Sequence, residues 1–217
     1  MRRLTRKESG LTAKEYTTLA RLTTPIKIQD FLDTFAFNWE QKGDTLMSPR
    51  RALAAKKANC LEGAILAAAT LWINGERPLI MNVSPQLGKG DDDHVVTLYK
   101  RGNRFGAISK TNHAVLRFRD PIYRTPRELV LSYFHEWFLN ATGKKLLECY
   151  SKPLDLRIFG TGWLTAEKDL WEIADMLGAL PHYYFVPKGN WRHIRTADPM
   201  EIKAGKLIEW PKSDPRT

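Results

Sequence analysis

The stretch "KKANCLEGAILAAATLWING", residues 56–75, organises this chain of 217 residues. Its apolar side chains recur at the three- and four-residue spacing of a helix, and Asn74 with Gly75 supplies a stop signal. Cys60 lies in the first turn of that helix. Because a helix N-terminus stabilises a thiolate, Cys60 is either a small core residue or a nucleophile.

The segments before this stretch carry helix signals of their own. Residues 11–22 and 24–38 have helical patterns, the second with Thr24 as N-cap and Pro25 at the first helical position. A similar start signal, Ser-Pro, opens "SPRRALAAKK" at residues 48–57. The N-terminal part of the chain is therefore expected to be helical.

After the Cys60 helix the pattern changes to strands. Residues 78–84, "PLIMNVS", form a short apolar run that is typical of a strand. Residues 94–100 and 104–110 predict two more strands, which the turn residues Gly102 and Asn103 join into a hairpin.

The C-terminal part returns to mixed structure. Residues 125–138 predict a strong helix, with Thr125 as N-cap and Glu128 completing a capping box. The segments that follow alternate strand, helix (residues 164–180) and strand. This order, helices first and then an antiparallel sheet with helical decoration, predicts an α+β fold.

The net charge of +10 favours acidic partners, including nucleic acid. The basic residues are scattered among apolar and acidic ones rather than gathered in one run. No RNP, zinc-finger, KH-type or basic-zipper pattern is found in the sequence. A solvated basic surface is therefore favoured over a nucleic-acid footprint.

The remaining bulk features exclude several other classes. The longest apolar run, residues 64–73, is half of the roughly 20 residues that a membrane span requires, and no apolar h-region follows the basic N-terminus. Cys60 and Cys149 have no neighbour at metal-ligand spacing. We expect a cytoplasmic protein without a membrane segment, a metal or another cofactor, in one domain with flexible ends at residues 1–8 and 211–217.

A cysteine nucleophile needs a base, and five histidines are available. His135, His182 and His193 lie in apolar or aromatic surroundings without a partner motif. His94 differs, because it opens the first hairpin strand directly after the acidic loop "GKGDDD". A rigid strand end that faces a cleft is a suitable place for a general base.

Residues 48–109 resemble the transglutaminase-like branch of the papain-like cysteine enzymes, by order and spacing. The positions that match its pattern are Ala58, Cys60, Ala64 and Gly75 on the helix and His94 and Phe105 on the hairpin. The resemblance implies a nucleophile helix packed on an antiparallel sheet, with a core at about residues 48–138 and with Cys60 and His94 as the catalytic pair.

The sequence departs from the family at the third catalytic position. Ser109 lies where the family has an aspartate, and Val96 replaces an aromatic residue. Ser109 accepts a hydrogen bond from an imidazole but supplies no negative charge. Asp91, Asp92 and Asp93 are alternative acids, although a solvated acidic loop is the favoured interpretation.

The hairpin turn decides which residue meets His94. A two-residue turn at 101–102 places Ser109 directly opposite His94, and one at 102–103 makes Ser109 its diagonal neighbour. A three-residue loop brings Asn112 to that face instead. Ser109 is the favoured third residue.

Other residues near the proposed catalytic pair have two possible roles each. Glu62 either binds substrate or, as we favour, holds a neighbouring loop in place. The oxyanion of the reaction accepts a hydrogen bond either from Asn59 or from the backbone N–H of Cys60. The charged segment that follows the hairpin either binds an anionic or peptide substrate or, as we favour, forms a salt-bridged connection; its charged residues are Arg117, Arg119, Asp120 and Arg124.

The leading functional hypothesis is a cysteine hydrolase or acyltransferase. Cys60 attacks a peptide or amide carbon, His94 shuttles the proton, and the acyl group passes to water in preference to an amine. Two alternatives stay open: a catalytically impaired binding module, which the missing acid at Ser109 motivates, and a basic nucleic-acid-binding protein.

Overall fold

The computed structural model describes residues 1–41 and 43–209. Its α-helices are α1 (Arg6–Ser9), α2 (Ala13–Ala20), α3 (Pro25–Asp33), α4 (Pro49–Ala55), α5 (Cys60–Ile73), α6 (Pro126–Leu131), α7 (Trp171–Ala179) and α8 (Pro199–Gly205). Short 3-10 helices are η1 (Leu156–Phe159), η2 (Gly162–Leu164) and η3 (Lys188–His193). The strands are β1 (Ala36–Phe37), β2 (Lys57–Ala58), β3 (Leu79–Pro85), β4 (His94–Arg101), β5 (Arg104–Ser109), β6 (Arg119–Tyr123), β7 (Leu147–Ser151), β8 (Leu154–Asp155) and β9 (His182–Tyr184).

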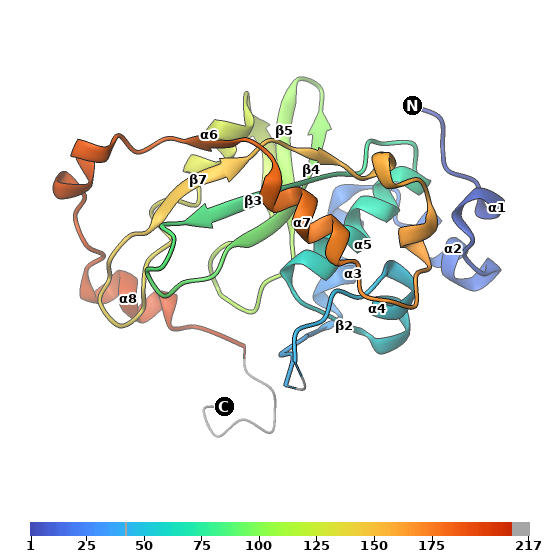
Figure 1. Cartoon of the computed structure of the whole chain (residues 1–217), viewed down its shortest axis with the longest axis horizontal. Coiled ribbons are helices and arrows are strands. Elements are labelled where there is room, and N and C mark those ends of the chain that lie inside the picture. Colours follow the sequence, from blue (N-terminus) through green and yellow to red (C-terminus); the bar gives the residue numbers. More distant parts are fainter. Residues whose placement is uncertain (42, 210–217) are drawn as a thin grey trace.

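Seven of these strands form one antiparallel sheet in the order β6-β5-β4-β3-β7-β9, with β8 also paired to β3. Helices α1 to α5 gather at one end of this sheet, and α8 lies at the other (Figure 1). The expected α+β class is therefore confirmed. A separate pair of strands, β1 and β2, is parallel and leads directly into α5.

Helix α5 is apolar on every side because it is covered on every side. It packs on β3, β4 and β5 and is surrounded by α2, α3 and α4. Its residues from Glu62 to Leu71 are all buried. The Thr97 hydroxyl of β4 donates to the Ala64 carbonyl, which fixes the helix along the strand.

The two faces of the sheet belong to two cores. Along β4, Val95 and Tyr99 pack with α5, whereas Val96 and Leu98 pack on the opposite face. Residues of α6 and the turn after it, including Tyr133, cover that second face. Alternating side chains thus explain why the hairpin strands are apolar almost throughout.

The N-terminus corrects one expectation. Residues 1–8 were predicted to be flexible, but the Leu4 side chain is buried and its N–H donates to the carbonyl of Trp72. Thr5 then caps α1 with a complete capping box. The prediction missed this contact because Leu4 reaches α5 only in the folded chain. The other predicted flexible end, residues 211–217, lies outside the described residues.

The two predicted C-terminal helices are shorter than expected. Helix α6 ends at Leu131, and Glu128 accepts from the N–H of Arg124 instead of completing the capping box at Thr125. Beyond α6 the chain continues in local turns, in which the N–H of Tyr133 donates to Val130, and then the Trp137 indole donates to Asp91. Helix α7 begins only at Trp171. In the described part of the chain, no helix is long and apolar enough to span a membrane.

Candidate active site

Cys60 lies where α5 begins, between the parallel strand pair and β4. The N–H of Asn38 donates to Ala58, which brings the chain after β1 alongside the helix start. The backbone N–H groups of Val95 and Leu61 act on the Cys60 sulfur and lower its pKa. The half-buried Cys60 and the first residue of β4, His94, line the same cleft of about 710 Å³.

The thiol of Cys60 is protonated at neutral pH. Burial raises its pKa to about 11, and the negative charges of Asp93 and Glu40 act in the same direction. The N–H donors of Val95 and Leu61 lower the pKa, but by less than burial raises it. Desolvation therefore has a larger effect on the pKa of the Cys60 thiol than the N–H groups at the helix start.

His94 is neutral for the same reason. Its side chain is buried, and this burial lowers its pKa to about 4, with a further contribution from His113. The site therefore holds a neutral thiol and a neutral imidazole at pH 7. A neutral imidazole retains one unprotonated nitrogen, so His94 can accept a proton.

The hairpin turn places Ser109 next to His94. Arg101 pairs with Arg104, so the turn consists of Gly102 and Asn103, the second of the two predicted geometries. Ser109 pairs with Val96 and is thus the diagonal neighbour of His94. Its Oγ lies 2.8 Å from the Nε2 of His94.

The hydrogen bonds of Ser109 determine the tautomer of His94. The Ser109 hydroxyl donates its only hydrogen to the carbonyl of Leu116, at 2.6 Å. Its oxygen must therefore accept from His94, which places the proton of the neutral ring on Nε2. The Nδ1 atom is left with the free lone pair, so it is the basic atom of the ring.

The backbone around Ser109 is held from two sides. Gln29 of α3 accepts from the Ser109 N–H and donates to its carbonyl, at 3.0 and 2.8 Å. Leu116 has a φ of 60°, a left-handed conformation that a leucine rarely adopts, and its N–H donates to Glu136. The Trp137 ring packs edge-on against His94 with 6.4 Å between centroids.

The alternative third residues do not bond to the imidazole among the described contacts. The side chain of Asp93 accepts from Asn82 at 2.7 Å, and that of Asp91 accepts from the Trp137 indole at 2.7 Å. Asn112 is buried and lines the cleft, and its carbonyl accepts from a backbone N–H of the C-terminal segment. Ser109 is therefore the residue that the structure brings to His94.

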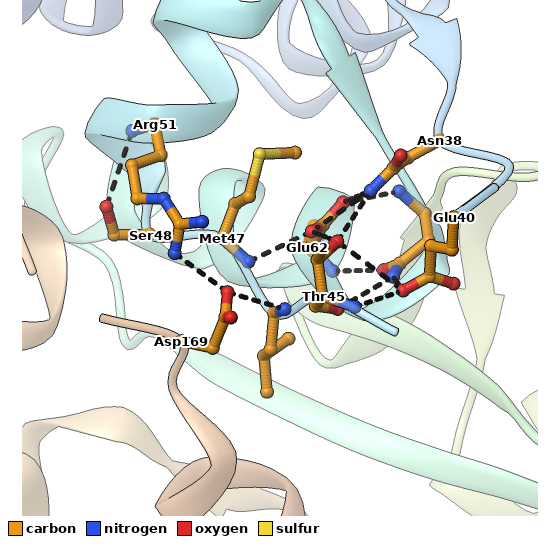
Figure 2. A network of polar contacts seen from close by, with 10 residues as sticks. Asn38, Glu40, Thr45, Met47, Ser48, Arg51, Glu62 and Asp169 are labelled. Atoms are coloured by element: carbon orange, nitrogen blue, oxygen red, sulfur yellow. Dashed lines mark hydrogen bonds and ion pairs between the residues drawn. The ribbon is translucent and has the colours of Figure 1, made fainter. Parts of the chain in front are cut away.

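Glu62 serves as a structural anchor (Figure 2). Its carboxylate is fully buried and accepts hydrogen bonds from four groups: the side chains of Asn38 and Thr45 and the backbone N–H groups of Met47 and Asn59. These bonds tie the loop after β1 to the first turn of α5. The loop-anchoring interpretation of Glu62 is thus the one that its contacts support.

Asn59 is occupied as the N-cap of α5. Its Oδ1 accepts from the N–H of Glu62, and its amide donates to Glu40 at 3.1 Å and to the carbonyl of Thr45 at 3.3 Å. Both amide hydrogens are used, so of the two oxyanion donors left open the Asn59 side chain is already occupied. The N–H of Cys60 remains, because first-turn N–H groups have no acceptor within their helix.

Much of the charged segment after the hairpin forms ion pairs. Arg119 pairs with Glu136 at 2.6 Å and also bonds to Ser132, and Arg117 pairs with Glu209 at 3.3 Å. These contacts fit the predicted salt-bridged connection.

The sequence interpretation missed several titratable residues of the cleft, among them His113 and Glu40. His113 lines it, and its pKa is lowered chiefly by burial, with Asp91 opposing that effect. Glu40 lines it from the loop after β1. The available signal for His113 was that His94 and His113 flank the same hairpin. No local pattern identifies Glu40, because the folded loop alone brings it to Cys60.

Among the described residues, no group of three or more His, Cys, Asp or Glu side chains is placed to hold a metal ion. No protein-family model matches the chain, and no curated protein matches it. Among solved structures, LapG of Legionella pneumophila is similar over 44% of this chain, with 16% identity and a TM-score of 0.34. The match spans 59% of LapG. A similarity this weak does not bear on function.

Proposed function

We propose that this protein is a cysteine hydrolase or acyltransferase that acts on a peptide or amide bond, with a transglutaminase-like, papain-like core. Cys60 is the nucleophile, His94 the general base and Ser109 the residue that orients the imidazole. One observation carries the proposal: Ser109 accepts from Nε2 of His94 at 2.8 Å, which leaves Nδ1 as the basic atom in the cleft that Cys60 also lines.

The reaction begins with the neutral pair. As the Cys60 sulfur attacks the amide carbon, the thiol proton passes to Nδ1 of His94. The resulting oxyanion meets the free N–H at the start of α5. The imidazolium then protonates the leaving amine, the C–N bond breaks, and a thioester joins the acyl group to Cys60.

The second half of the cycle repeats the proton transfer. His94 takes a proton from water, the hydroxide oxygen attacks the thioester, and the thiolate that leaves regains its proton from His94. The products are a carboxylic acid and free Cys60. An amine in place of water would give a new amide by the same steps.

The Ser109 contact supports a slower variant of this chemistry. A serine hydroxyl bonded to a carbonyl fixes the orientation of His94 but adds only partial negative charge beside it. An imidazolium is therefore stabilised less than it would be beside a carboxylate. Proton transfer accompanies the attack on the substrate rather than preceding it.

A binding module is the second candidate. The raised pKa of Cys60 favours it, because a thiol that stays protonated is a poor nucleophile until the site changes. Nucleic-acid binding is not favoured.

The test uses the full chain with Cys149→Ser, so that Cys60 is the remaining cysteine. A library of peptide amides is incubated with the protein, the mixture is quenched in acid, and intact mass reports any acyl group on Cys60. We expect an adduct that His94→Ala reduces at least about tenfold, the lower range for loss of a general base. An absence of both adduct and turnover, with unchanged peptide binding, would assign the binding module instead.

A further inference from the structure

The cleft around Cys60 has the opposite charge to the rest of the chain. The whole chain has a net charge of +10. Among the described residues that line the cleft, the acidic ones are Glu40, Asp44, Asp91, Asp92, Asp93 and Glu136. The lining includes one lysine, Lys110, and its ammonium group is directed away into the carbonyls of Leu32 and Phe35.

Five of these six acids have no basic partner in the ion pairs that the described residues form. Glu136 is paired with Arg119, but none of the ion pairs formed by described residues includes the other five. The partners of Asp93 and Asp91 are an amide and an indole, which donate hydrogen bonds without adding positive charge. The cleft is therefore an acidic pocket on a basic protein.

The acids come from two separate loops that meet at the nucleophile. Glu40 and Asp44 follow β1, and Asp91, Asp92 and Asp93 precede β4. One acid from each loop, Glu40 and Asp93, acts through its charge on Cys60. Acids from both loops thus act on the atom that we assign to the chemistry.

Aromatic side chains accompany the acids. The cleft is also lined by Phe37, Trp39, Trp137, Phe138 and Trp171. Aromatic faces attract ammonium and guanidinium groups but do not ligate metal ions. Since no metal-binding group is found among the described residues, acids together with indole rings favour an organic cation over a bare metal ion.

We propose that the cleft selects peptides with lysine or arginine side chains next to the bond that Cys60 attacks. This specificity rests on the proposed function, because it concerns the same site. The exposed carboxylates of Asp44 and Asp92 pair with the ammonium or guanidinium group of the substrate. The indole rings of the cleft pack on the aliphatic part of the same lysine or arginine side chain.

The same contacts would prepare the nucleophile. Asp93 and Glu40 oppose ionisation of Cys60, so a bound cation that offsets their charge removes part of that opposition. A cationic substrate would therefore favour deprotonation of the thiol that attacks it. A neutral peptide of the same length would bind without this effect.

The binding test separates recognition from catalysis by using full-length Cys60→Ala. Calorimetry compares three probes: acetyl-trilysine amide, acetyl-trinorleucine amide and acetyl-triglutamate amide. We expect the trilysine probe to bind most tightly and to weaken with added salt. Asp44→Asn and Asp92→Asn should each weaken it about threefold, and the double variant about tenfold. Asp30→Asn, an exposed acid on α3 outside the cleft, is the matched control and should change nothing.

The outcomes separate the two proposals. Equal affinity for the trilysine and trinorleucine probes, or trilysine binding that ignores both cleft variants, overturns the cationic specificity. Trilysine binding with no acyl group ever found on Cys60 leaves the specificity in place and removes the enzyme. Acylation by neutral or acidic peptides in preference to cationic ones removes the specificity alone.

Discussion

The start of α5 and the end of β5 support the two residues that we propose for the reaction, Cys60 and His94, by different means. Near Cys60, a fully buried carboxylate, Glu62, gathers four hydrogen bonds and fixes the loop after β1. Near His94, Ser109 is held by neutral groups, the Gln29 amide and the Leu116 carbonyl. The buried carboxylate, Glu62, thus stabilises the loop at the start of α5. The imidazole of His94 is instead held by Ser109, a polar but uncharged residue.

Removing Glu62 should have the largest effect. Glu62→Ala leaves four buried donors without an acceptor, so we expect a loss of about 3 kcal/mol or more in the free energy of unfolding. Urea unfolding measures it. Glu62→Gln should cost less, because one oxygen remains, and Glu172→Ala on the exposed face of α7 should be neutral. A Glu62→Ala protein as stable as the wild type would show that the loop does not depend on this anchor.

The neutral support at His94 should appear as a pH dependence of stability. The folded pKa of about 4 lies below the usual 6.5, so the unfolded chain binds the extra proton first as the pH falls. The contribution of neutral His94 to the free energy of unfolding is complete above about pH 6.5. It is lost as the pH falls toward 4, and its maximum is about 3 kcal/mol.

The measurement is urea unfolding between pH 7 and 4 for the wild type and His94→Gln. We expect the wild type to lose more stability than the variant over this range. His113, whose pKa is also lowered, is present in both proteins, so the part of its effect that burial causes cancels in the comparison. Parallel curves for the two proteins would contradict a buried, neutral His94.

A carboxylate at position 109 would give His94 a charged neighbour, as Glu62 is near Cys60. Ser109→Asp puts a carboxylate beside the imidazole, so the pKa of His94 should rise from about 4 by roughly 1 to 3 pH units. NMR titration of the His94 ring measures the change. Ser109→Asn is the matched control, because it has similar size and no charge. A His94 pKa that is the same in both variants would show that position 109 does not control the imidazole electrostatically.

The sequence predicted the helix and the hairpin that carry the site, but not the pKa values of the residues in it. Helical spacing identified α5, and the turn residues Gly102 and Asn103 left two places for Ser109 relative to His94, with Asn112 as the alternative for a longer loop; the structure has the two-residue turn. The sequence did not predict the raised pKa of Cys60, because the burial that causes it depends on how distant segments of the chain pack around the sulfur. Gln29 was missed for the same reason, since 80 positions separate it from the residue it binds.

The smallest expected effect concerns Leu116, whose carbonyl accepts the hydrogen bond of the Ser109 hydroxyl. Its left-handed backbone, with φ of 60°, directs the carbonyl to Ser109. Leu116→Gly and Leu116→Ala both remove the side chain, but only glycine adopts this conformation without strain. The Gly variant should therefore be more stable than the Ala variant by about 1 kcal/mol in urea unfolding. Equal stability would mean that residue 116 leaves the left-handed region once its side chain is gone, and the Ser109 hydroxyl would then lose the carbonyl that orients His94.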